Sequence, residues 1–151
     1  VSLFDDTIKY AAIPLAALMP IVAGMGGNAG TQTFTVVIRG LALGQFASTT
    51  TGRVATKEML VGLGNGIGNG LLIAIVYSVF FRNAYVGVAL GLAMITNMVV
   101  AGATGTLVPV ALKAMRIDPA VASSVIVTTF TDAFGYGTFL LVATMFLSHL
   151  M

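Results

Sequence analysis

The residues from Thr56 to Phe81 read TKEMLVGLGNGIGNGLLIAIVYSVFF, and this stretch decides the fold class. From Met59 onward it holds no charged residue, and about 20 such residues are enough for a helix to cross a bilayer. It shows no sustained alternation of apolar and polar residues, and a membrane barrel needs about eight strands to close. The stretch therefore predicts a transmembrane helix.

The rest of the chain has the same character. Apolar residues make up 58% of the 151 positions and charged residues only 8%, whereas soluble domains carry about a quarter charged residues. Three further stretches are long and apolar enough to span a membrane: about Thr7–Gly27, about Tyr85–Met115, and the stretch that follows Asp118-Pro119 and reaches about Leu147. We therefore predict an all-α, polytopic transmembrane bundle with four spans, and a single domain over residues 1–151.

The glycines at the end of the first span predict a break in its helix. Residues 24–30 contain four glycines, and glycine lacks the side chain that favours helical geometry. The apolar residues that follow, 33–38, are too few to cross on their own, so we expect them to continue the first helix beyond this Gly-rich break.

Glycines and other small residues also recur every four positions in the second and third spans. They are Gly62, Gly66 and Gly70, a second register at Gly64 and Gly68, and then Ala89, Ala93, Asn97, Ala101 and Gly105. Such spacing predicts close helix packing in lipid, where apolar side chains gain nothing by leaving their surroundings. We expect Asn65, Asn69 and Asn97 to form hydrogen bonds between helices, and Asn97 could also line a cavity.

Loop charges predict the topology. Five basic residues lie in loops on one side of the membrane: Arg39, Arg53, Lys57, Lys113 and Arg116. Only Lys9 and Arg82 lie on the other side, so loops 39–57 and 113–118 are predicted to be cytoplasmic in a multi-pass protein of the inner (plasma) membrane. The first span then starts outside, and the chain has no initiator Met. We therefore expect a fragment of a longer protein with another span upstream.

Composition argues against several classes of function. The chain has no cysteine, which excludes disulfides and thiolate metal sites, and no Lys or Arg run that would bind nucleic acid. The only histidine, His149, lies about 25 Å of helix from Asp132. Because paired-acid or nucleophilic catalysis needs a second acid or a nearby base, we do not expect an enzyme.

Asp132 is the one acid that the sequence places deep in the membrane. It lies about 20 Å into the fourth predicted span, where a charged side chain costs on the order of 3 kcal/mol. No Lys or Arg lies at that depth, so two possibilities remain: a protonated acid in a dry site, or a carboxylate kept charged by water or a cation.

The neighbours of Asp132 favour the second possibility. Ser124 and Thr128 precede it at four-residue intervals, and further small or polar groups lie near it or on the expected facing wall: Thr129, Thr131, Gly135, Tyr136, Asn28, Thr31, Gln32 and Thr35. Their oxygens suit Mg²⁺, Ca²⁺ or Mn²⁺ rather than soft metals. One carboxylate can hold a cation that keeps much of its water, and a two-fold axis would bring two Asp132 side chains together.

Two long segments resemble a known family. Residues 20–33 (PIVAGMGGNAGTQT) and 37–44 (VIRGLALG) are similar to the signature of MgtE-type magnesium channels, and residues 3–8, 117–120 and 129–132 resemble other parts of them. The similarity covers essentially the whole chain. It implies a homodimer with five transmembrane helices per protomer, of which the first is largely missing here. It also implies that the cytoplasmic amino-terminal and CBS domains of the family are absent.

The resemblance also implies roles for individual residues. Asp132 matches the pore aspartate that holds hydrated Mg²⁺ with its dimer mate, and the Thr128 carbonyl matches a main-chain ligand one turn earlier. Ser124 stands where some members carry asparagine, and this departure affects the ligands at the cytoplasmic mouth. The pore would be lined by the first and fourth spans, and its expected lining residues are Gly27, Asn28, Thr31, Thr129 and Gly135.

The predicted function is passive, Mg²⁺-selective permeation, with Mn²⁺, Co²⁺ or Ca²⁺ as alternative ions. A proton- or sodium-coupled carrier of divalent cations, with Asp132 as the coupling acid, is the alternative, and the Gly-rich break is compatible with it. A purely structural bundle with a protonated Asp132 is a third reading.

Overall fold

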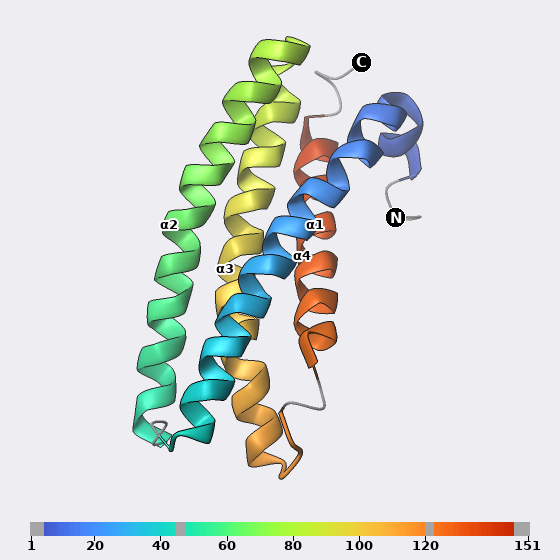
Figure 1. Ribbon diagram of the computed structural model, residues 1–151. Helices are drawn as coiled ribbons and strands as arrows, with labels where there is room; N and C mark the ends of the chain where they lie inside the picture. Colours follow the sequence, from blue (N-terminus) through green and yellow to red (C-terminus); the bar gives the residue numbers. More distant parts are fainter. Residues whose placement is uncertain (1–4, 45–47, 120–122, 147–151) are drawn as a thin grey trace.

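In the computed structural model, the described residues form four helices: α1 (Asp5–Ala42), α2 (Ser48–Phe81), α3 (Ala84–Ala114) and α4 (Ser123–Met145) (Figure 1). It describes the backbone of residues 5–44, 48–119 and 123–146, and the side chains of residues 18–44, 51–119 and 124–146. These residues contain no strand. Among the described residues, three helical stretches are long and apolar enough to cross a membrane: Thr51–Phe81, Ala84–Ala114 and Ser124–Met145. The first predicted span, about Thr7–Gly27, lies mostly outside the residues whose side chains are described. The prediction of an all-α membrane bundle is confirmed.

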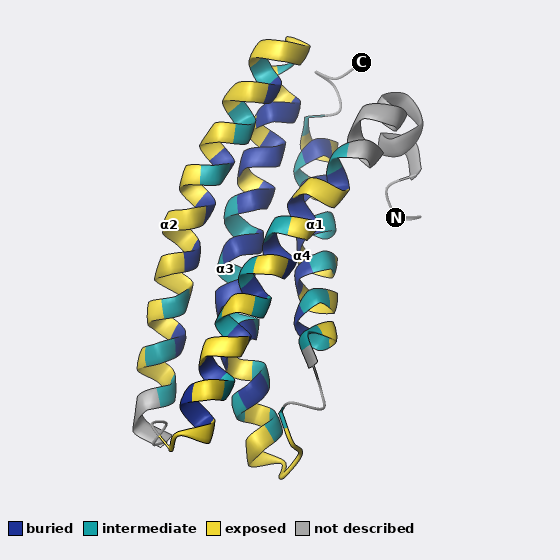
Figure 2. Cartoon of the chain, in the orientation of Figure 1, coloured by how far each residue is buried: buried dark blue, intermediate teal, exposed yellow. Residues whose placement is uncertain are grey.

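Helix α3 is the centre of the bundle. It packs against the other three helices, whereas α2 packs on α3 and α1 packs on α3 and α4. Figure 2 shows the consequence, since α3 is buried along most of its length and α2 is buried only along the face that it turns to α3. Small residues make this central position possible, because Ala89, Ala93 and Ala101 are fully buried between neighbouring helices.

The Gly-rich break predicted in the first helix is wrong. Helix α1 runs without interruption through residues 24–30. A side chain on Gly26 would overlap the Asn97 amide of α3, and one on Gly30 would come within 2.6 Å of Val127 in α4. These glycines therefore allow α1 to approach its neighbours closely, and that packing stabilises a helix that glycine's propensity alone would not favour.

Two helix boundaries also differ from the prediction. Helix α2 begins at Ser48, before the predicted start at Thr56, and the Thr56 hydroxyl donates a hydrogen bond to the Gly52 carbonyl within it (3.0 Å). Helix α4 begins at Ser123, after Asp118-Pro119. Asp118 and Pro119 instead follow the end of α3, where Arg116 takes a left-handed conformation and Ile117 N–H donates to the Leu112 carbonyl (2.9 Å).

One of the two glycine registers of α2 explains its packing on α3. A side chain at Gly62, Gly66 or Gly70 would collide with α3 backbone atoms. Gly64 and Gly68 have nothing within 4 Å of the position of a Cβ. The predicted close packing is therefore confirmed, for one register only.

The three asparagines behave differently from one another. Asn97 is 0% exposed, and its Nδ2 donates to the Val22 carbonyl of α1 at 2.7 Å, which confirms an interhelical hydrogen bond. Asn69 donates instead to the Asn65 carbonyl of its own helix (2.9 Å), so the interhelical prediction is wrong for it. The Asn65 side chain is exposed.

Replacing Asn97 by leucine is expected to destabilise the bundle by about 1–2 kcal/mol, because an interhelical hydrogen bond is lost in a tightly packed site. Asn69→Leu is the matched control. It should change the free energy of unfolding little, since the Asn69 amide donates to the Asn65 carbonyl within an exposed turn of α2. The midpoint of unfolding in a denaturing-detergent titration measures both. Equal midpoints for the two variants would contradict this role of Asn97.

Candidate cation site

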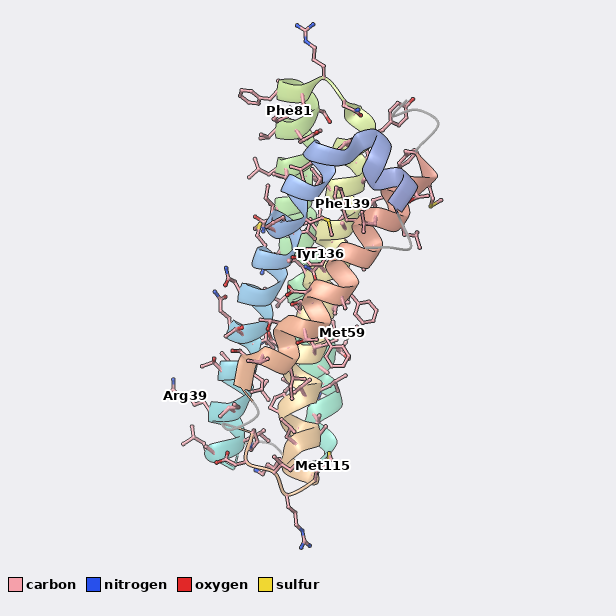
Figure 3. All side chains as sticks on the ribbon, turned by 90° about the vertical axis from the view of Figure 1, so that its right-hand side faces the viewer. Arg39, Met59, Phe81, Met115, Tyr136 and Phe139 are labelled. Atoms are coloured by element: carbon pink, nitrogen blue, oxygen red, sulfur yellow. The ribbon has the colours of Figure 1, made fainter. Side chains whose placement is uncertain are left out.

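Helices α1 and α4 border a groove of about 290 Å³ on one face of the bundle. Its α1 wall is formed by Pro20, Ala23, Gly24, Gly27, Asn28 and Thr31, and its α4 wall by Thr128, Asp132 and Tyr136. Figure 3 looks onto α4 and shows Tyr136 between the end marked by Arg39 and the end marked by Phe81. The groove therefore lies away from both ends of the bundle.

Asp132 is the one acidic residue on this groove. It lies about 13 Å along α4 from Ser123 and about 20 Å from Met145, so it is near the middle of the helix. Its side chain is half-buried, and within the described residues no hydrogen bond or ion pair to its carboxylate is found. The described part of the chain therefore gives the Asp132 carboxylate no neutralising partner.

The walls of the groove offer oxygen atoms whose hydrogens are engaged elsewhere. The Thr31 hydroxyl donates to the Gly27 carbonyl (2.8 Å), and the Thr128 hydroxyl donates to the Val125 carbonyl (3.0 Å). Because each hydroxyl donates its hydrogen bond within its own helix, its oxygen lone pairs remain free to accept from, or coordinate, a group in the groove. Such an arrangement suits a cation or its water shell.

Gly27 is what brings the two walls together. A Cβ on Gly27 would lie 3.3 Å from the Thr128 Cγ2 atom, which is tighter than ordinary contact. An alanine at this position would require the Thr128 side chain to move by a few tenths of an ångström. The Thr128 carbonyl already accepts a hydrogen bond from the buried Thr131 hydroxyl (3.0 Å), so the hydroxyl is the less committed oxygen of Thr128.

The sequence also matches a family of known proteins. A family profile described as a divalent cation transporter, MgtE, matches residues 19–142, which include every residue that lines the groove. The chain belongs to the MgtE family.

Several curated relatives carry the name magnesium transporter MgtE. The protein of Bacillus subtilis is 33% identical over 150 residues, which is 99% of this chain and 33% of the relative. That of Enterococcus faecalis is 34% identical, also over 99% of this chain and 33% of the relative. That of Thermus thermophilus is 32% identical over 94% of this chain and 31% of the relative. The chain thus spans about a third of the length of these relatives.

Not every predicted site residue of this MgtE-family chain reaches the groove. The structure brings together Asp132, Thr128, Gly27, Asn28 and Thr31. Ser124 and Thr129 are not among the lining residues, and the exposed Thr129 donates its hydroxyl to the Val125 carbonyl (2.8 Å).

Gly135 lies behind the groove. It is buried, and a side chain there would come within 2.7 Å of the Asn97 amide and 3.3 Å of Val22. In the single chain it therefore packs in the core between α3 and α1 and does not line the groove. Pro20 and Ala23 do line it and were not predicted, although Pro20, Gly24, Gly27 and Thr31 recur at the three- or four-residue spacing of one helical face.

A second polar region, between α1 and α2, was also not predicted. A cavity of about 210 Å³ is lined there by Gln32, Thr33, Glu58 and Asn65, among others, and the Thr33 hydroxyl donates to Glu58 Oε2 (3.2 Å). Gln32, expected to face Asp132, belongs to this region instead. Within the described part of the chain, no group of three or more His, Cys, Asp or Glu residues forms a candidate metal site.

Proposed function

We propose that this chain forms the permeation path of a Mg²⁺ channel, in which a hydrated divalent cation passes Asp132. The observation that carries the proposal is the half-buried Asp132 carboxylate at mid-helix, which has no partner among the described residues and lines a groove with hydroxyl and amide oxygens. Membership of a family of divalent cation transporters supports the same reading. Mg²⁺ flux into liposomes, measured for the wild type and for Asp132→Asn side by side, is the test.

The hydration of the ion follows from the small number of ligands. Mg²⁺ demands six oxygen ligands at about 2.1 Å and gives up its water reluctantly. One carboxylate and two hydroxyls cannot replace a complete water shell. The groove therefore suits an ion that keeps most of its water and is held through it, with Mn²⁺, Co²⁺ and Ca²⁺ as competitors.

A homodimer is the second part of the proposal. The groove lies on the surface of the bundle, where a lone chain would expose Asp132 and Asn28 to lipid. If a second copy is related to the first by a two-fold axis, the groove of each chain faces that of the other. Both Asp132 carboxylates can then face one ion. Two negative charges then balance the charge of Mg²⁺.

The ends of the bundle support an orientation in the plasma membrane. Helices α1 and α3 end, and α2 and α4 begin, at the same end of the bundle, whereas α2 ends and α3 begins at the opposite end (Figure 1). The basic residues of the first end are Arg39, Arg53, Lys57, Lys113 and Arg116. We place this end in the cytoplasm because short cytoplasmic loops carry an excess of Lys and Arg.

Passive flow distinguishes this proposal from a coupled carrier. A membrane potential of 100 mV contributes about 4.6 kcal/mol to the entry of a doubly charged ion, so no second gradient is needed. The uninterrupted α1 also removes the broken helix that was compatible with a carrier.

Collapsing the proton and sodium gradients across liposomes is therefore expected to leave the rate of Mg²⁺ uptake unchanged. The measurement uses a Mg²⁺-sensitive dye inside the vesicles, with the potential clamped by a potassium gradient and valinomycin. A rate that falls when either gradient is removed at constant potential would favour the coupled carrier.

A further inference from the structure

A cleft of about 410 Å³ opens between the last turns of α1 and the first turns of α2. It is lined by Arg39, Lys57 and Glu58, together with Val36, Gly40, Leu43 and Val54. The cleft exists because α1 and α2 each pack on α3. It lies on a different side of α1 from the groove that holds Asp132, and the two share no lining residue.

The charges of the cleft are not balanced among the residues that the structure describes. Arg39 and Lys57 are exposed, and within the described residues neither forms an ion pair. Glu58 is half-buried and accepts a hydrogen bond from the Thr33 hydroxyl of α1 at 3.2 Å. Two cations and one carboxylate leave the cleft with a net charge of about +1.

The length of α2 places the cleft near the level of the lipid headgroups. From Phe81 to Lys57, α2 spans about 36 Å, whereas the hydrocarbon core of a bilayer is about 30 Å thick. If Phe81 is near one boundary of that core, Lys57 lies beyond the other. Arg39 is in the last turn of α1, at the same end of the bundle. Both cations are thus at the depth where phosphates lie.

We propose that this cleft binds the headgroup of an anionic phospholipid of the phosphatidylglycerol type. The Arg39 guanidinium can donate two parallel hydrogen bonds to the phosphate, and the Lys57 ammonium adds a second cation. A single negative charge matches the net charge of the cleft, and basic pockets between transmembrane helices bind such headgroups. The exposed side chain of Val36, one turn before Arg39 and nearer the membrane centre, offers an apolar surface to an acyl chain.

The apolar residues and the cations together favour a lipid over a soluble anion. Val36 is 65% exposed on the membrane side of Arg39, so a free phosphate would leave this apolar surface uncovered. A bound lipid would add a second link between α1 and α2 beside the Thr33–Glu58 hydrogen bond. The proposal depends on the membrane position of the helices and not on the role of Asp132.

The test compares the protein in nanodiscs of phosphatidylcholine with and without phosphatidylglycerol. Phosphatidylglycerol should raise the melting temperature of the wild type, and native mass spectrometry should show one retained phosphatidylglycerol per chain. In Arg39→Gln/Lys57→Gln, binding should weaken about thirtyfold, because each cation near the membrane surface contributes about a factor of five. Arg53→Gln is the control. Arg53 is exposed and lies one turn before Lys57 in α2, but it does not line the cleft.

Each other outcome overturns the proposal. Undiminished binding in the double variant, or equal loss in Arg53→Gln, would show that general charge attraction is responsible. Equal stabilisation by phosphatidylethanolamine would remove the preference for an anionic headgroup, and equal stabilisation by soluble glycerol phosphate would make the ligand a free anion. A lower melting temperature of the double variant in pure phosphatidylcholine would mean that the two cations stabilise the chain itself.

Discussion

Replacing Asp132 by asparagine is expected to lower Mg²⁺ flux at least tenfold while the bundle stays folded. The substitution keeps the size of the side chain and removes its charge. Asp132 has no hydrogen-bond or ion-pair partner within the described residues, so the change breaks no contact of the chain itself. Its effect should therefore fall on the ion.

The expected size follows from Coulomb's law. A hydrated Mg²⁺ lies about 5 Å from a carboxylate oxygen, which is one Mg–O distance plus one hydrogen bond. Even with the dielectric constant of water, one negative charge attracts it at this distance by about 1.7 kcal/mol, which is a factor of more than ten in occupancy. A lower local dielectric constant, or a second carboxylate from a dimer mate, makes the loss larger.

The control for this experiment is Asp118→Asn. It makes the same change of charge in the exposed connection after α3, outside the groove. Flux should be close to that of the wild type in this variant and nearly absent in Asp132→Asn, with size-exclusion profiles and helical circular dichroism unchanged in both. Full Mg²⁺ flux through folded Asp132→Asn would exclude this carboxylate from the pathway.

Replacing Gly62 by alanine is expected to destabilise the bundle by about 1–3 kcal/mol, which is the usual cost of overfilling a packed interface. The added methyl group would collide with the Met98 carbonyl of α3, and backbone atoms cannot move aside as the end of a flexible side chain can. Helix α2 packs mainly on α3, so it has little other interface to compensate for the separation.

Gly64→Ala provides the matched control two residues further along the same helix. Nothing lies within 4 Å of a Cβ there, so alanine should be neutral or should stabilise α2 by up to about 1 kcal/mol through its higher helix propensity. In a denaturing-detergent titration, the unfolding midpoint of Gly62→Ala should fall below that of the wild type. The midpoint of Gly64→Ala should equal that of the wild type or exceed it. A neutral Gly62→Ala would mean that α2 and α3 are further apart than described.

Much of the candidate site could be predicted because depth along a helix is a property of the sequence. The isolation of Asp132 from every Lys and Arg is visible from residue numbers, and so is the four-residue interval that joins it to Thr128. The facing residues Gly27, Asn28 and Thr31 were also predicted, through the resemblance and the polar pattern, and all three line the groove with Asp132.

The sequence by itself determined that this is a helical membrane protein of the MgtE family, because apolar length and motif are local properties of the chain. Only the tertiary structure decided which way each helix faces. Gly135 faces Asn97 in the core, and Gly26, Gly27 and Gly30 contact neighbouring helices where a break was expected. Asn97 joins α3 to α1, whereas Asn69 bonds within α2. The physical reason is that the rotation of a helix about its axis is set by the surfaces that it meets, and those surfaces come from parts of the chain that are distant in sequence.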